Sequence, residues 1–148
     1  MTRHIHRDPV RLPDGTTIIA ASYLSPDPYT RDQNPQYGLY LDPRWQPPWD
    51  HDHLDWPDFG VPADRAVVVS SLQSLLDRAR QGRTVEIGCL GGHGRTGTAL
   101  ALLAVLAGHP PDDAVAWVRH HYCPDAVETR AQLAYVLEDD QGQDQAGS

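Results

Sequence analysis

The segment Glu86-Ile87-Gly88-Cys89-Leu90-Gly91-Gly92-His93-Gly94-Arg95-Thr96-Gly97-Thr98 decides how this chain folds. The residues Thr84–Gly88 read as a strand, and Thr98–Ala107 are apolar on all sides, which predicts a buried helix. A strand that enters a helix through a glycine-rich loop forms a cradle for an anion, because backbone N–H groups point inward and the helix N-terminus attracts negative charge. The sequence therefore predicts a phosphate-binding loop between this strand and this helix.

Two kinds of loop use such a cradle, and their spacing separates them. The nucleotide-binding loop requires Gly-x-x-x-x-Gly-Lys-Ser/Thr, but Cys89 stands in place of its first glycine and Arg95 in place of its lysine. The pattern Cys-x-x-x-x-x-Arg-Thr fits Cys89, Arg95 and Thr96. This spacing lets the loop wrap around a tetrahedral phosphate, with the thiol at its base and the guanidinium at its rim. The helix N-terminus and Arg95 should both favour the thiolate of Cys89.

A second motif, whose Asp58 lies thirty-one residues before Cys89, reads Trp56-Pro57-Asp58-Phe59-Gly60-Val61-Pro62. Together with the cysteine loop, it resembles the Cys-dependent protein tyrosine phosphatase superfamily, whose mobile acid loop carries Trp-Pro-Asp. A third segment, Glu128-Thr129-Arg130-Ala131-Gln132-Leu133, is similar to the glutamine loop of that family. The three segments follow one another in the order that the family has.

The resemblance implies an α/β fold with a central mixed sheet flanked by helices. It also implies that Cys89 is the nucleophile, that Asp58 is the general acid, and that Thr96 donates its hydroxyl to the sulfur. Gln132 would orient the hydrolytic water. The phosphate-binding residues that the resemblance implies are Leu90, Gly91, Gly92, His93, Gly94 and Arg95. The implied reaction is hydrolysis of a phosphomonoester through a cysteinyl-phosphate, and it needs neither a metal nor a cofactor.

Two positions depart from the family pattern. Gly88 replaces the histidine that usually precedes the cysteine, and Glu128 replaces the first glutamine of the glutamine loop. The 148 residues point to the compact, dual-specificity-like or atypical branch, whereas Trp56–Pro62 is similar to the acid loop of the tyrosine-specific branch. The expected substrate is therefore a phosphotyrosine or phosphoserine/threonine protein, with a small phosphorylated metabolite or an inositol phosphate as the alternative.

Two further functions compete with hydrolysis. A pseudophosphatase would bind a phosphorylated partner without turnover, and the departures at Gly88 and Glu128 are its support. However, binding alone requires neither the thiol of Cys89 nor the carboxyl group of Asp58. A rhodanese-like loop for sulfur transfer also holds a cysteine in an anion cradle, but it does not explain the Trp-Pro-Asp motif.

Composition excludes several classes of partner. The chain carries a net charge of −8 and no lysine, so we expect neither nucleic acid nor an anionic membrane surface as a partner. The longest apolar run, Ala99–Ala107, is too short to span a bilayer. The first residues lack the apolar run of a signal peptide, and two cysteines make no disulfide framework. We therefore expect a cytoplasmic protein.

The chain reads as one phosphatase domain over residues 1–148. Residues 1–62 are rich in proline, which predicts short strands and loops. The aromatic side chains of this half are expected to pack it, with an aromatic wall beside the pocket as the alternative. Residues 63–138 carry the remaining elements, and 139–148 read as a flexible tail. The other predicted strands are Thr16–Ala21 and Tyr37–Leu41, and the other predicted helices are Asp64–Ala79, Asp112–His121 and Glu128–Leu137.

Several polar residues allow two interpretations. His93 favours highly anionic substrates or simply faces water. Glu86 holds Arg95 in place or faces outward. The segment Asp50–Asp55, rich in aspartate and histidine, is typical of a solvated loop, although its side chains could also bind a metal. Cys123 is expected to be an inert packing thiol rather than a redox partner of the nucleophile.

Overall fold

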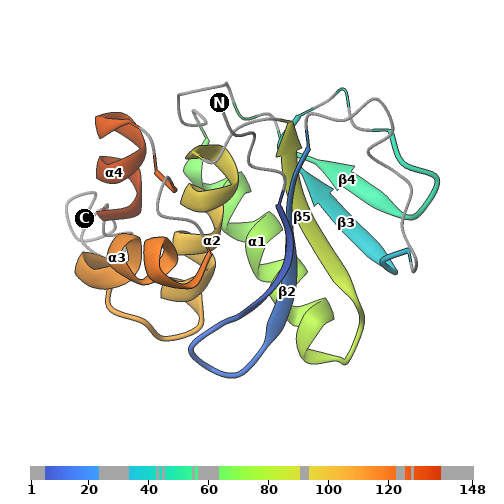
Figure 1. Cartoon of the computed structure of the whole chain (residues 1–148), viewed down its shortest axis with the longest axis horizontal. Helices are drawn as coiled ribbons and strands as arrows, with labels where there is room; N and C mark the ends of the chain where they lie inside the picture. The colour runs from blue at the N-terminus through green and yellow to red at the C-terminus, as the bar shows by residue number, and fades with distance from the viewer. Residues whose placement is uncertain are drawn as a thin grey trace.

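The central element of the fold is β5 (Val85–Leu90), in a five-stranded sheet of order β1-β2-β5-β3-β4. β2 (Thr17–Tyr23) and β3 (Tyr37–Tyr40) flank β5 in parallel, and β4 (His51–His53) pairs in parallel with β3. β1 (His6–Arg11) pairs antiparallel with β2 (Figure 1). The sheet is therefore mixed, which confirms the fold class that the resemblance implies.

This computed structural model describes most of the chain. The described residues are 6–23, 34–42, 44, 46–54, 56, 64–90, 94–122, 126–127 and 129–137.

The described residues also form four helices, of which α2 (Gly94–Leu106) is the central one. It contacts α1 (Arg65–Arg80), α3 (Pro111–His121), α4 (Arg130–Leu137) and the strands β2 and β5. Figure 1 shows α2 between the sheet and the pair formed by α3 and α4. Every side chain from residue 95 to residue 104 is buried. An all-round apolar sequence is typical of a helix enclosed in this way, so the predicted buried helix is confirmed.

The strand and the helix around the glycine loop both extend further than their sequence predicts. β5 continues to Leu90 rather than ending at Gly88, and α2 begins at Gly94 rather than at Thr98. The low helix propensity of glycine hides this first turn in the sequence. Gly97 is nevertheless required there, because a Cβ atom at this position would lie 2.5 Å from the Cβ atom of Ala126.

Two edge strands were absent from the sequence-based prediction. β1 contains Pro9, which removes a backbone donor and is tolerated only where a strand has a free edge. β4 has three residues and lies inside the segment Asp50–Asp55, which the sequence indicates as a solvated loop. Short, polar edge strands carry little hydrophobic alternation, so their positions depend on pairing with β2 and β3.

The face of the sheet opposite the helices holds a buried polar network. The Tyr40 hydroxyl donates to Oε1 of Glu86 at 2.9 Å and accepts from Nε1 of Trp49 at 2.8 Å. Glu86 is fully buried, so the outward-facing alternative for this residue is wrong. Burial of Tyr37, Tyr40 and Trp49 agrees with the expectation that the aromatic residues pack the proline-rich half.

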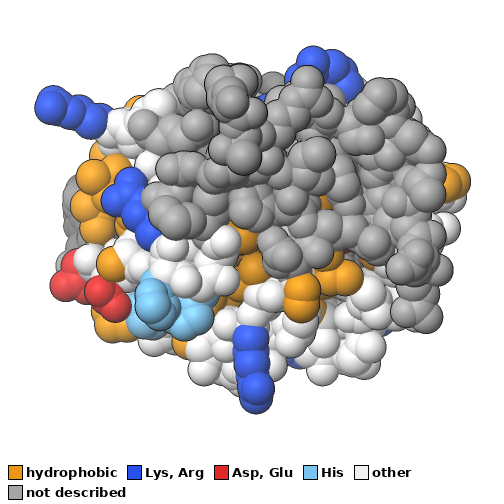
Figure 2. Space-filling view, in the orientation of Figure 1, with side chains coloured by type: hydrophobic (Ala, Val, Ile, Leu, Met, Phe, Trp, Pro, Cys, Tyr) orange, Lys and Arg blue, Asp and Glu red, His pale blue; other side chains and the backbone are white. Residues whose placement is uncertain are grey.

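No continuous basic patch appears among the described residues on the face shown in Figure 2, where the arginines lie apart from one another. Within the described part of the chain, no helix combines the length and the apolar composition that crossing a bilayer requires.

Candidate active site

The buried thiol of Cys89 is the centre of the site. Cys89 lies one residue before the end of β5 and is fully buried. Thr96, in the first turn of α2, donates its hydroxyl to the Cys89 sulfur at 2.8 Å. The strand thus carries the sulfur to the N-terminal end of a helix, where the helix dipole and a hydroxyl donor both favour a thiolate.

The guanidinium group of Arg95 lies in the same buried region, and backbone carbonyls hold it in place. Its Nη1 donates to the carbonyl of Leu41 at 3.2 Å and to that of Trp56 at 3.4 Å. The side chain is only 4% exposed. Burial of a permanent cation is costly unless charged or hydrogen-bonded partners surround it, and these two carbonyls are part of that surrounding.

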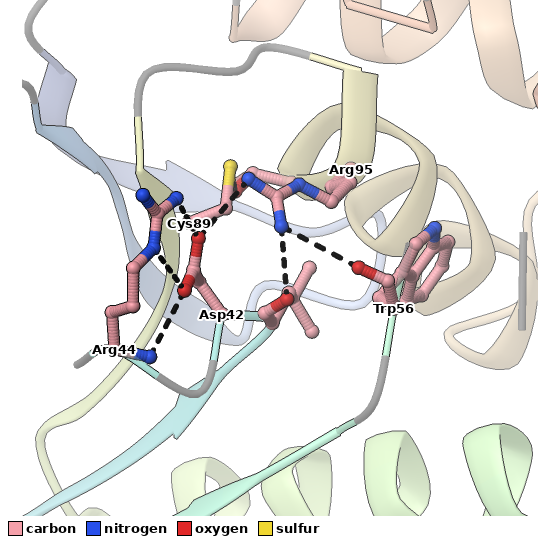
Figure 3. A network of polar contacts seen from close by, with 7 residues as sticks. Asp42, Arg44, Trp56, Cys89 and Arg95 are labelled. Carbon is pink, nitrogen blue, oxygen red and sulfur yellow. Dashed lines mark hydrogen bonds and ion pairs between the residues drawn. The ribbon is translucent and has the colours of Figure 1, made fainter. Parts of the chain in front are cut away.

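The carboxylate that pairs with this guanidinium belongs to Asp42, a residue that the sequence analysis did not single out. Asp42 follows β3 and is buried, and its Oδ2 lies 3.5 Å from Nη2 of Arg95. Arg44 donates to the same carboxylate through its backbone N–H, Nε and Nη2, at 2.9, 2.9 and 2.6 Å. These hydrogen bonds from Arg44, with the charge of Arg95, lower the pKa of Asp42 to about 2 against the opposing effect of burial. Figure 3 shows Asp42 between the two arginines, with Cys89 beside them.

The acid motif is attached to this cluster at its first residue. Trp56 is buried, its carbonyl accepts from Arg95, and its ring packs edge-on against Tyr135 of α4 at 5.9 Å between centroids. Arg65 donates to the Tyr135 carbonyl at 2.6 Å and fixes that part of α4. Asp58, two residues beyond Trp56, lies outside the described residues.

Gln132 is buried at the start of α4, and the helix cap orients it. Its Oε1 accepts from the backbone N–H of Thr129 at 3.3 Å, and the Thr129 hydroxyl accepts from the backbone N–H of Gln132 at 3.1 Å, which is the reciprocal pattern of a capping box. Just before this cap, Val127 has a positive φ of 63°, an unusual conformation for a β-branched residue. Arg119 donates to the Val127 carbonyl at 2.9 Å and helps to hold it.

Gly88 occupies a position where the neighbouring strand leaves no room for a side chain. A Cβ atom there would lie 2.9 Å from the backbone oxygen of Ala21 in β2. The histidine that usually precedes the cysteine in the family would therefore force a shift of β2. The departure at Gly88 follows from the close approach of two strands.

The structure brings together three of the residues that the sequence analysis singles out, namely Cys89, Arg95 and Thr96, and it places Gln132 at the cap of α4. Leu90 ends β5, and Gly94 begins α2. The other predicted positions, Asp58, Gly91, Gly92, His93, Glu128 and Cys123, lie outside the described residues.

Two side chains of the segment Asp50–Asp55, which could also bind a metal, are placed by contacts within the protein. Asp52 accepts from the Tyr37 hydroxyl at 2.6 Å, and a ring nitrogen of His51 lies 2.8 Å from the carbonyl of Trp49. Within the described part of the chain, no group of three or more histidine, cysteine, aspartate or glutamate residues could hold a metal ion.

Comparison with known proteins agrees with this geometry. Residues 47–136 match the family model of the Swiss Army Knife protein, DSP-PTPase phosphatase domain (PTP-SAK). The uncharacterized protein MJECL20 of Methanocaldococcus jannaschii is 40% identical over 83 residues, which are 55% of this chain and 53% of that protein. The chain therefore spans about half the length of the curated relatives it matches.

Three solved structures show the same fold at low sequence identity. Tk-PTP in its active form has a TM-score of 0.69 and 23% identity, over 88% of this chain and 97% of that one. Kinase associated phosphatase has a TM-score of 0.72 and 18% identity, over 100% and 98%. The core catalytic domain of the PP-IP phosphatase SIW14 from S. cerevisiae has a TM-score of 0.61 and 16% identity, over 99% and 94%.

The family match covers more than half of the chain, and it includes the acid motif, the cysteine loop and the glutamine loop. The chain belongs to the PTP-SAK family of DSP-PTPase phosphatase domains, within the Cys-dependent protein tyrosine phosphatase superfamily.

Proposed function

We propose that this domain hydrolyses phosphomonoesters through a cysteinyl-phosphate intermediate. The observation that carries the proposal is the convergence of a buried thiol, its hydroxyl donor Thr96 and the enclosed guanidinium of Arg95 at the N-terminus of α2. Such a site combines a nucleophile with fixed positive charge where the negative charge of a phosphoryl group develops.

In the first step, the Cys89 thiolate attacks phosphorus and forms the S–P bond. The P–O bond to the leaving group breaks on the opposite side, and Asp58 donates a proton to the departing oxygen. Arg95 and the backbone N–H groups of residues 90–95 bind the equatorial oxygens. The products of this step are an alcohol or phenol and the cysteinyl-phosphate.

In the second step, water attacks the phosphorus of the cysteinyl-phosphate. Asp58, now a carboxylate, takes a proton from this water, which the Gln132 amide orients. The S–P bond breaks, inorganic phosphate forms, and the electron pair returns to sulfur. The Thr96 hydroxyl stabilises the departing thiolate through the hydrogen bond described above. We propose that the enzyme acts in the cytoplasm, where a free thiol is kept reduced.

The proposed substrates are phosphotyrosine or phosphoserine/threonine proteins. A small phosphorylated metabolite or an inositol phosphate is the second candidate, and the fold shared with a PP-IP phosphatase supports it. Release of phosphate from phosphopeptides, compared with release from soluble phosphometabolites at equal concentration, separates the two candidates.

The test is hydrolysis of para-nitrophenyl phosphate in excess EDTA by the wild type and by Cys89→Ser. We expect activity that survives the chelator and is abolished in the serine variant. Loss of activity in EDTA would contradict the metal-free route. Failure of the wild type to turn over any phosphomonoester between pH 5 and 8 would favour the phosphate-binding alternative.

Asp58→Asn tests the general acid. We expect kcat to fall by about 10²–10⁴-fold, the usual contribution of a positioned proton donor. The effect should be smaller for aryl phosphates with acidic leaving groups, because these need less protonation. An equal loss for good and poor leaving groups would remove Asp58 from this role.

A further inference from the structure

The strained residue Val127 lies between α3 and the cap of α4. Its φ of 63° falls in the left-handed region, which a β-branched side chain rarely adopts. Among the described residues, glycines are the only others with a positive φ. A conformation of this kind persists only where the surrounding structure enforces it, and such residues gather at functional sites. At Val127, a side chain of α3 enforces it.

The guanidinium group of Arg119 binds the backbone on both sides of Val127. Its Nε donates to the carbonyl of Ala126 and its Nη2 to the carbonyl of Val127, each at 2.9 Å. Because peptide units are planar, the two dihedral angles of Val127 are the only soft rotations between these two carbonyls. A planar guanidinium that binds both oxygens therefore fixes the conformation of Val127.

The same turn packs against the phosphate-binding end of α2. Ala126 and Val127 are both buried. A Cβ atom at Gly97 would lie 2.5 Å from the Cβ atom of Ala126 and 3.1 Å from the backbone nitrogen of Val127. Gly97 follows Arg95 and Thr96 in the first turn of α2. The turn is therefore in contact with the part of the helix that carries these two side chains.

On its other side, the turn leads into the cap that orients Gln132. Thr129 follows Val127 by two residues, and its backbone N–H donates to Oε1 of Gln132 at 3.3 Å. The Thr129 hydroxyl accepts from the backbone N–H of Gln132 at 3.1 Å, and Gln132 is fully buried. A rotation at Val127 would displace this cap relative to α2, and the Gln132 amide would move with it.

We propose that Arg119 is a positioning residue for the hydrolysis of the cysteinyl-phosphate. By fixing Val127, it holds the cap of α4 in place against the start of α2, and it thereby holds the Gln132 amide beside the attacking water. Arg119 acts through Gln132 and not on the phosphoryl group. This inference rests on the proposed function, because Gln132 orients the water only in that mechanism.

The two steps of the reaction separate this role from a general loss of structure. The ratio kcat/KM includes the steps up to formation of the cysteinyl-phosphate, whereas kcat also includes its hydrolysis. A slower second step therefore lowers kcat and KM together and leaves kcat/KM unchanged. Loss of folded enzyme lowers kcat and kcat/KM by the same factor and leaves KM unchanged.

The experiment measures hydrolysis of para-nitrophenyl phosphate by the wild type, Arg119→Ala, Arg119→Lys and Arg80→Ala, in the steady state and by stopped flow. Arg119 is exposed, so its replacement should preserve the fold, which circular dichroism checks. Arg119→Lys keeps the charge but not the fork that binds two carbonyls, and it decides the test if Arg119→Ala does not fold. Arg80→Ala is the matched control, because Arg80 is also an exposed helical arginine that binds an oxygen outside its helix, on Asp14 at 2.7 Å.

We expect Arg119→Ala to lower kcat about tenfold, the scale of loss when a reacting group is misplaced. KM should fall in proportion, kcat/KM should stay at the wild-type value, and a burst of para-nitrophenol should precede the slow steady state. Arg119→Lys should show the same pattern with a smaller loss, and Arg80→Ala should keep the wild-type constants. An unchanged kcat in both Arg119 variants, or a lower kcat with an unchanged KM, would overturn the inference while leaving hydrolysis intact.

A double variant tests the route through Gln132. If Arg119 acts through Gln132, then Arg119→Ala combined with Gln132→Ala should lose little more kcat than Gln132→Ala alone. Losses that multiply would contradict this route. Failure of the proposed function has a different signature: a wild type that hydrolyses no phosphomonoester, or activity that survives Cys89→Ser, would reject the mechanism and the inference with it.

Discussion

The two ends of β3 carry the same kinds of polar residue but differ in charge balance. At its N-terminal end, the Tyr37 hydroxyl donates to Asp52 at 2.6 Å, and the Arg78 guanidinium lies 3.8 Å from the centroid of the Tyr37 ring. Burial, followed by the hydrogen bond to Asp52, raises the pKa of Tyr37, so the phenol stays neutral. Beyond its C-terminal end, Asp42 faces two arginines.

The comparison shows that position along the sheet decides what such a cluster can bind. At the N-terminal end, one acid meets one cation through a neutral ring, and the surrounding hollow is lined by Asp50 as well as by Arg83. At the C-terminal end, two cations meet one acid beside the start of α2. Helix N-termini gather at the carboxyl ends of parallel strands, which is where anions bind in open α/β sheets. We therefore propose that the second cluster lies at the phosphate site, whereas the first stabilises the fold.

Exchange of one arginine for lysine at each end of β3 should produce the largest difference in kcat/KM between the two ends. Arg95→Lys removes the planar fork that holds two phosphate oxygens, and we expect kcat/KM for para-nitrophenyl phosphate to fall by about 10²–10³-fold. Arg78→Lys should leave kcat/KM within about twofold, because the cation–π contact of Arg78 with Tyr37 lies at the other end of β3 and contributes only about 1 kcal/mol to stability. A large loss of activity in Arg78→Lys would break the comparison.

Replacement of Asp42 and of Asp52 by asparagine should sharpen the comparison between the two ends of β3. Asp42→Asn keeps the shape but removes the charge that orients Arg95, so we expect kcat to fall about tenfold through misplacement of the guanidinium. KM should not rise, because removal of a negative charge strengthens phosphate binding. Asp52→Asn is the matched control and should retain the wild-type kcat. Steady-state kinetics on the same aryl phosphate measures both, and a rise in KM without a change in kcat for Asp42→Asn would argue against the orienting role.

The smallest expected effect concerns acid stability. The folded pKa of Asp42 is lowered to about 2, whereas an unfolded aspartate titrates near about 3.9. The contribution of Asp42 to the free energy of unfolding is therefore complete above pH 4 and is lost as the pH falls through about 2. We expect about 1 kcal/mol, since Arg44 is exposed and solvent screens its half of the pair. The free energies of unfolding of the wild type and of Asp42→Asn, measured with urea, should differ by a constant amount from pH 5 to 8. The two values should converge below pH 4.

Local signals in the sequence were sufficient to predict that the helices and the central strand exist, but not where each of them begins and ends. Asp64 caps α1 by accepting from the Val67 N–H at 3.2 Å, and the predicted helix starts there. The α4 start was predicted at Glu128, two residues too early, because the helix begins after the Thr129 cap. The strands β1 and β4 depend on pairing with β2 and β3, and no local sequence pattern predicts these pairings.

The sequence by itself determined the proposed nucleophile, the arginine and the hydroxyl donor beside it, since a loop that wraps a phosphate requires fixed spacing between neighbours in the chain. Only the tertiary structure decided which carboxylate faces that arginine. Asp42 lies 53 positions before Arg95 in the chain and reaches it because β3 pairs beside β5. Strand order brings distant residues together, and it depends on the packing of the whole sheet rather than on any motif.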